Sequence, residues 1–257
     1  MRIDKNAHED ERGWALVSVL WIVSILAMLA AATQALVSTS YRSERQHLES
    51  AEADALFEAG LSRAALGLID NEAASRWRVD GIPKWFTFNG QTVKIAVQDE
   101  LGRIDLNATD GSVLHRLFLS AGLDEDQSET MTDRVLDWRS PTDLKHLHGA
   151  TSADYAAAGY PYRPRHGPFQ TVEELKLVMG MTPTLFARVR PALTVYTKRP
   201  MFDPNTAPKE ALLALPGNDE ARVENILAER AQNPGETSNP AGTISPSMGL
   251  GGRTFTI

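Results

Sequence analysis

The sequence has no cysteine among its 257 residues. This absence excludes disulfides, thiolate zinc sites and cysteine nucleophiles. Positive charge is also scarce, because 26 lysines and arginines face 33 aspartates and glutamates, which gives a formal net charge of −7. Such a balance argues against a protein whose main task is to neutralise nucleic-acid phosphates. The sequence shows no phosphate-binding loop and no nucleophile beside a base, so we do not expect an enzyme.

Charge is missing altogether from one long stretch near the N-terminus, residues 13–41. A helix needs about 20 apolar residues to cross a bilayer, so residues 14–41 predict a membrane span. A secretory signal has a shorter apolar region of about 7–15 residues and then a small-residue cleavage site. The three alanines at residues 30–32 leave that alternative open. Arg2, Lys5 and Arg12 precede the span and indicate, weakly, a cytoplasmic N-terminus.

The segment after the span, residues 43–70, is rich in alanine, leucine and glutamate, with apolar residues at helical spacing. No proline or turn cluster separates it from the span. The pattern therefore predicts one continuous helix of about 57 residues, roughly 85 Å long at about 1.5 Å per residue. The alternative is an anchor followed by a separate helix, with a break near residues 38–40.

Strand patterns follow the helix. Residues 85–88 and 92–97 are aromatic or β-branched and flank Asn89-Gly90, a dipeptide typical of tight hairpin turns. These residues predict an antiparallel hairpin. A further short extended segment is expected after Gly102.

Three later segments resemble one another. Residues 106–139 and 204–230 each begin with an asparagine-led cap and a leucine-rich helix, turn at a glycine (Gly122 or Gly217) and end in a second helix. Residues 170–193 form a weaker copy, for which Thr171 and Glu174 predict a capping box. The three segments are similar to helix-hairpin-helix units.

Units of this kind often bind DNA through backbone N–H groups at the hairpin and nearby basic side chains. Here acidic residues follow two of the hairpin glycines, at positions 124–126 and 219–220. Repulsion between these carboxylates and phosphate disfavours a membrane-tethered DNA-binding protein. We therefore expect protein-facing helices and no nucleic-acid partner.

The N-terminal region resembles type IV pilins and type II secretion pseudopilins. The resemblance lies in a short polar leader that ends at Gly13, an apolar helix from Trp14 and an amphipathic continuation. In that family a prepilin peptidase cuts after the glycine and methylates the new N-terminus, which implies a cut between Gly13 and Trp14. Most members have glutamate at the fifth mature position, where this chain has Ser18. An unpaired buried carboxylate is costly, and the K-type minor pseudopilin (general secretion pathway protein K) is the member known to lack it.

Several other stretches resemble the K-type pattern, at residues 99–107, 135–139, 159–182 and 203–208. The resemblance implies an α+β fold, in which a pilin-like long N-terminal helix packs on a small antiparallel sheet. It also implies a large inserted helical domain that contains the helix-hairpin-helix-like repeats. The expected parts are a prepilin leader (1–13), a transmembrane and amphipathic helix (14–75), a β-rich pilin core (76–107), the helical insertion domain (108–230), and a linker with a C-terminal strand (231–257).

By the same resemblance, the function is that of a minor pseudopilin of the type II secretion system. It would initiate and cap the pseudopilus tip for export of folded proteins across the outer membrane. The implied partners are the I-type and J-type minor pseudopilins, the prepilin peptidase and the inner-membrane secretion platform. The implied location is the bacterial inner membrane, with a single span and the C-terminal domain in the periplasm. A type IV pilus minor pilin is the alternative.

The family also has an aspartate-rich calcium site in the loop that corresponds to residues 137–155. Calcium prefers six to eight oxygen ligands, and Asp137 and Asp143 remain here, with Asp154 as a further candidate. Hydroxyl residues stand at three expected carboxylate positions: Ser140, Thr142 and Thr151. No cofactor is required, and both a weak calcium site and a metal-free loop stay open. We expect His146 and His148 to be solvated rather than to bind zinc.

The last part of the chain, residues 231–257, is rich in glycine, proline and serine and predicts a flexible linker. It ends in a candidate strand at residues 254–257. In the family a strand at this point returns to the sheet and the chain continues further. Here the sequence stops early, which leaves the completion of the sheet open.

Overall fold

The computed structural model describes residues 7–70, 76–232 and 254–256; the side chains of residues 7–13, 15, 16, 33, 35–48 and 255 are not described. The chain divides into two compact units, Met1–Ala59 and Gly60–Ile257. Each unit is described by itself.

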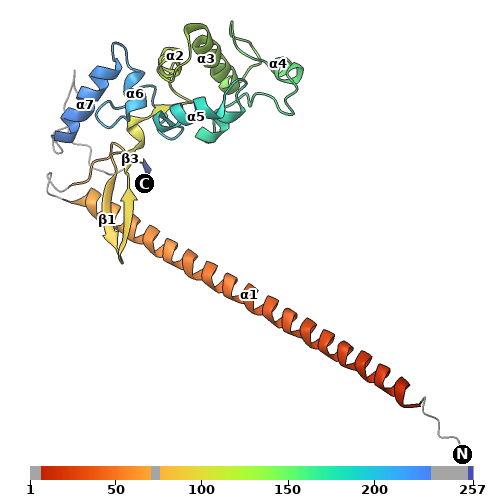
Figure 1. Cartoon of the computed structure of the whole chain (residues 1–257). Coiled ribbons are helices and arrows are strands. Elements are labelled where there is room, and N and C mark those ends of the chain that lie inside the picture. The colour runs from red at the N-terminus through yellow and green to blue at the C-terminus, as the bar shows by residue number, and fades with distance from the viewer. Residues whose placement is uncertain (1–6, 71–75, 233–253, 257) are drawn as a thin grey trace, which may run out of the picture. The chain divides into compact units, whose positions relative to one another are not determined.

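The first unit is part of a single helix, α1 (Ala7–Ile69), which has 63 residues and continues into the second unit (Figure 1). The predicted continuous helix is confirmed, and the alternative break near residues 38–40 is wrong. The helix begins earlier than expected, within the predicted leader. Its early residues contain no proline, and a single helical glycine costs only about 1 kcal/mol relative to alanine.

Within the described part of the chain, no helical stretch combines the length and the apolarity needed to cross a membrane. The span predicted at residues 14–41 includes positions whose side chains lie outside the described set, namely 15, 16, 33 and 35–41. The membrane span therefore stays a prediction.

In the second unit, the last turns of α1 pack on a β-hairpin. Strands β1 (Lys84–Phe88) and β2 (Gln91–Ile95) pair antiparallel around a turn in which Asn89 and Gly90 both have positive φ, 49° and 79°. This conformation is that of a type I′ turn, so the hairpin prediction is confirmed, although residues 96 and 97 lie beyond β2. The hairpin packs directly on this part of α1, because a methyl group at Gly60 would be in ordinary van der Waals contact with Ile95 Cδ1, at 3.6 Å.

The apolar residues buried between α1 and the hairpin form a small core of their own. Gly67 is required there, because a methyl group on it would lie 2.4 Å from the ring of Trp77. The Trp77 backbone N–H also donates to the Gly67 carbonyl, at 2.8 Å. The members of this cluster are Ala64, Leu68, Trp77, Ile95 and Val97.

The remaining strands do not join the hairpin in one sheet. Strand β3 (Gln98–Asp99) pairs antiparallel with β6 (Phe255–Thr256), and β4 (Ile104–Asp105) pairs in parallel with β5 (Leu193–Thr194). The expectation of one small antiparallel sheet is therefore wrong for the described residues, which form three two-stranded sheets. Parallel pairing needs a long crossover, and here the crossover between β4 and β5 contains most of the helical domain.

The helical domain holds the largest apolar core of the second unit. The three segments predicted to be alike each contain two helices around a glycine with positive φ: Gly122 (97°), Gly180 (89°) and Gly217 (73°). In the middle copy the first helix is a 3-10 helix. The helices are α2 (Gly111–Ser120), α3 (Glu125–Arg139), α4 (Ser152–Ala157), α5 (Pro183–Val189), α6 (Lys209–Leu213) and α7 (Glu220–Gln232), with 3-10 helices η1 (Glu100–Gly102), η2 (Val172–Leu177) and η3 (Arg190–Ala192).

Side-chain caps begin several of these helices. Asp124 and Gln127 form a reciprocal capping box at the start of α3, and Thr182 caps α5. The capping box predicted at Thr171 and Glu174 is wrong, because Thr171 makes no side-chain cap. The Glu174 carboxylate is used elsewhere and accepts hydrogen bonds from the buried Trp138 ring and from the Arg165 guanidinium.

Arginine side chains tie the helix pairs together through backbone carbonyls. Arg116 of α2 donates to the Ala214 carbonyl at 2.7 Å, and Arg188 of α5 donates to the Ala121 carbonyl at 2.8 Å. Arg134 of α3 likewise donates to a carbonyl after η2. Helix ends leave carbonyls without intrahelical partners, so each arginine joins one copy to the end of another.

A close backbone approach at Gly102 yields a test of this packing. A methyl group there would lie 2.5 Å from the Thr206 carbonyl oxygen and 2.8 Å from the Ala207 nitrogen. We expect Gly102→Ala to lower the free energy of unfolding by about 1–3 kcal/mol, measured by urea denaturation with tryptophan fluorescence. Gly167→Ala is the matched control, because the nearest atom to its methyl group would be 3.9 Å away. Equal stabilities of the two variants would contradict the packing.

Candidate functional site

The residues predicted for leader cleavage and filament contact lie on α1. Gly13 falls within the helix, although its surroundings are not described, and the side chain of Trp14 is 80% exposed. The Ser18 hydroxyl donates to the Trp14 carbonyl at 2.7 Å. A serine that bonds back to the preceding turn satisfies its own donor. Ser18 therefore needs no polar partner from outside its helix.

The loop between α3 and α4 depends on Asp137, which is 3% exposed near the end of α3. Its Oδ1 accepts from the His146 ring Nδ1 at 2.5 Å and from the His146 backbone N–H at 3.2 Å. Its Oδ2 accepts from the Ala150 N–H at 2.9 Å. Only glycine fits at position 149, because a methyl group there would lie 1.7 Å from Asp137 Oδ2. One buried carboxylate thus fixes the path of the loop.

The other two candidate ligands bind other donors. Asp143 accepts from the Ser152 N–H at 3.1 Å and lies 3.4 Å from the His166 ring Nε2. Asp154 accepts from the Thr151 N–H and hydroxyl, both at 2.8 Å, and pairs with Lys145 Nζ at 3.1 Å. The pKa of Asp154 is lowered to about 2. The largest cause is the hydrogen bond from the Thr151 backbone N–H, followed by the one from its hydroxyl and by Lys145. Asp154 therefore completes a capping box for α4.

As folded, these three carboxylates do not fit a calcium ion. The structure directs N–H, hydroxyl or ammonium donors at them instead of gathering them around one point. Across the described residues, no group of three or more histidine, aspartate and glutamate side chains is placed to hold a metal. Calcium needs several oxygens converging on one position, and here hydrogen bonds close the loop.

His146 and His148 are exposed, as predicted, with side chains 48% and 43% accessible, but both also contact carboxylates. His146 binds Asp137, and the His148 backbone N–H donates to Asp133 Oδ2 at 2.9 Å, with its ring 3.7 Å from the same oxygen. These contacts of the two histidines were not predicted from the sequence. The only sequence signal for these contacts was the spacing of the two histidines before Gly149. This spacing does not identify the carboxylates that the histidines contact.

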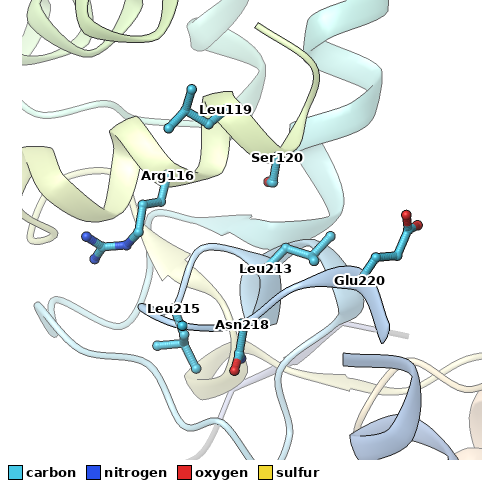
Figure 2. Close-up of a pocket in the computed structure, with 8 residues that line it drawn as sticks. Arg116, Leu119, Ser120, Leu213, Leu215, Asn218 and Glu220 are labelled. Atoms are coloured by element: carbon cyan, nitrogen blue, oxygen red, sulfur yellow. The ribbon is translucent and has the colours of Figure 1, made fainter. Parts of the chain in front are cut away.

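The hairpin of the third copy borders a surface groove with a volume of about 430 Å³. Figure 2 shows Arg116, Leu119 and Ser120 on α2 and, from α6 onward, the residues Leu213, Leu215, Asn218 and Glu220. The Asn218 amide donates to the Leu212 carbonyl at 2.9 Å, and Arg116 is held by Ala214. The polar groups near this hairpin are therefore used within the fold. Leucines beside charges of both signs suit a protein surface better than a phosphate backbone.

The Asp137 contacts predict how the loop responds to mutation and to calcium. Asp137→Asn removes the charge and places an NH₂ group near N–H donors, so we expect the free energy of unfolding to fall by about 2–3 kcal/mol. The loss should be equal in calcium chloride and in EDTA, measured by urea denaturation. The exposed Asp126 provides the control, since Asp126→Asn should change stability by about 0.5 kcal/mol or less. A calcium-dependent gain in the wild type that Asp137→Asn abolishes would contradict the metal-free loop.

Comparisons with known proteins agree with this architecture. The family model "Type II secretion system (T2SS), protein K", first domain, matches residues 93–198. The type II secretion system protein K of Klebsiella pneumoniae is 25% identical over 203 residues, which cover 70% of this chain and 61% of that protein. The protein K of Pectobacterium carotovorum subsp. carotovorum is 24% identical over 204 residues, 70% of this chain and 62% of that protein. The chain thus covers less than two thirds of the length of these relatives.

A solved structure shows a similar fold. A chain of the crystal structure of the GspK-GspI-GspJ complex from the enterotoxigenic Escherichia coli type 2 secretion system matches with a TM-score of 0.51 and 16% identity, covering 67% of each chain. At this identity the likeness shows the fold alone. The matched domain at residues 93–198 and the two curated relatives confirm the resemblance drawn from the sequence. The chain is therefore similar to the protein K family of type II secretion systems, whose model matches residues 93–198.

Proposed function

We propose that the chain is a minor pseudopilin that assembles with I-type and J-type subunits to initiate and cap a type II secretion pseudopilus. It serves the export of folded proteins across the outer membrane by assembly and not by catalysis. The observation that carries the proposal is an exposed apolar stripe on α1, in a chain whose fold is similar to one solved in a complex with GspI and GspJ.

The stripe consists of Leu61, Ala65 and Ile69, which follow one another every four residues and so lie on one face of α1. All three are exposed, Leu61 by 44% and Ile69 by 66%. The adjacent face, with Ala64 and Leu68, is already buried against the hairpin. An apolar stripe of this kind is typical of helix-to-helix packing between subunits.

Ser18 supports a position at the end of the filament. A glutamate at this place would need an amine from a neighbouring subunit, because an unpaired carboxylate in apolar surroundings is costly. The Ser18 hydroxyl instead donates a hydrogen bond to the Trp14 carbonyl of its own helix. A subunit with this residue can end a filament without leaving an unpaired charge.

The N-terminal part completes the proposal. Residues 14–41 anchor the chain in the bacterial inner membrane, where the secretion platform assembles the pseudopilus, and the C-terminal domain faces the periplasm. Prepilin peptidase removes residues 1–13 on the cytoplasmic side. The uncharged run that begins at Gly13 supports this assignment.

Mass spectrometry of the mature N-terminus tests the processing step. In a host that has prepilin peptidase, we expect the chain to begin at a methylated Trp14. Replacement of the glycine, Gly13→Leu, should leave the leader attached, whereas the nearby Ala7→Leu should be processed normally. A mature chain that starts near Ala32 would identify a secretory signal instead and would contradict the pseudopilin assignment.

The stripe on α1 yields a second test, by co-purification of the chain with I-type and J-type subunits from the same organism. Leu61→Glu places a charge in the stripe, and desolvation of that charge should weaken the complex at least about tenfold, a cost of about 1.4 kcal/mol or more. Leu144→Glu is the matched control, because Leu144 is 76% exposed in the loop before α4. The proposal fails if both variants recover the partners equally well.

A further inference from the structure

A second groove lies on the helical domain, beside the segment that precedes η2. Its volume is about 740 Å³ and it is open to solvent. We name it the tyrosine groove, after the residues of its wall. The wall residues used below are Tyr160, Pro161, Tyr162, Arg163 and Pro164.

Buried aromatic rings hold the two groove tyrosines in place. The rings of Tyr160 and Tyr162 lie 5.4 Å apart, and Tyr155 lies 5.4 Å from the first and 6.0 Å from the second. Tyr155 is 1% exposed, and its hydroxyl oxygen accepts the Met179 N–H at 2.7 Å. Trp138, which is 2% exposed, packs against Tyr162 at 6.4 Å. Rings fixed in this way lose little freedom when a ligand binds.

The polar groups of the wall are left available. Within the described residues, the hydroxyls of Tyr160 and Tyr162 make no hydrogen bond, although both side chains are half-buried. Burial raises the pKa of Tyr162, and a neutral tyrosine hydroxyl is a hydrogen-bond donor. Hydroxyl groups of half-buried tyrosines ordinarily find a partner. These two are therefore placed to donate to a ligand.

The charges around the groove are unbalanced. Glu174 is compensated, because its Oε1 accepts from Trp138 Nε1 at 3.0 Å and from Arg165 at 2.5 Å. Arg163 is exposed and, among the residues that the structure describes, pairs with no carboxylate. The wall therefore presents one uncompensated cation next to tyrosine and proline faces.

We propose that the tyrosine groove binds an extended, proline-containing acidic segment of a partner protein. Such a segment adopts the polyproline II conformation, which has no internal hydrogen bonds and leaves its carbonyls free to accept from tyrosine hydroxyls. Aromatic-lined grooves recognise proline-rich segments in this way, and Arg163 selects a carboxylate by charge complementarity. The groove is too open to enclose a small ligand. This proposal does not depend on the pseudopilin role.

Calorimetry with the full chain in detergent micelles tests the proposal. The probe is an acetylated, amidated ten-residue peptide that alternates Pro-Pro with Glu, and saturable one-to-one binding is expected. Two matched peptides carry Gln for every Glu or Ala for every Pro. Each should bind about tenfold more weakly, a loss of about 1.4 kcal/mol. Equal affinity for all three peptides, or no binding of the first, would overturn the proposal.

Protein variants locate the binding to this groove. Arg163→Ala should weaken the acidic peptide about tenfold and leave the Gln peptide unchanged, whereas the exposed Arg199→Ala should change neither. Tyr162→Phe keeps the ring but removes the donor, so it should weaken both peptides severalfold, and Tyr196→Phe, at a tyrosine outside the groove, should not. All four variants should keep the wild-type thermal unfolding midpoint. Binding that survives Arg163→Ala and Tyr162→Phe unchanged would refute the assignment.

Discussion

The helical domain depends on the end of α3, because two neighbouring residues there make the contacts that position the loop, α4 and the aromatic residues before η2. The Asp137 carboxylate accepts hydrogen bonds from the His146 ring and from two backbone N–H groups of the loop. The Trp138 ring packs against aromatic side chains that follow in the sequence. Hydrogen bonds to a buried charge each contribute about 1.5–3 kcal/mol. The loop carries α4, and α4 carries Tyr155 into the core. The positions of the tyrosines in the groove thus depend on the loop path that the Asp137 carboxylate fixes.

Donors of the chain itself lie against the carboxylates of the loop between α3 and α4. A cation in such a loop neutralises several carboxylates that would otherwise repel one another. Here hydroxyl residues replace part of that charge, and Lys145 and His166 lie against the remaining carboxylates. Fewer negative charges need less compensation, and hydrogen-bond donors of the chain itself can supply it. The hydroxyl residues and the internal donors therefore both reduce the repulsion between carboxylates in this loop.

Local sequence signals predicted local structure well. Asn89-Gly90 determined the hairpin register, because only a type I′ turn fits two strands that meet at that dipeptide. Uninterrupted helical spacing predicted α1, and Gly122 and Gly217 predicted the turns within the first and third helix pairs. The pairing of β4 with β5, the arginine bonds to carbonyls and the His146 contact were not predictable. Each joins residues through tertiary packing, which no periodicity records, and Glu174 shows that such packing can override a local capping signal.

The arginine bonds show how basic side chains near the hairpins are used within the fold. A guanidinium has five N–H donors, and a bond from one of them to a carbonyl fixes the position of the whole group. Arg116 and Arg188 instead bond to the carbonyls of Ala214 and Ala121, each at the end of a helix in another copy. Release of either guanidinium would leave a carbonyl without its donor and loosen the contact between copies. The fold therefore holds these two guanidinium groups against helix ends, where they contribute to packing between the copies.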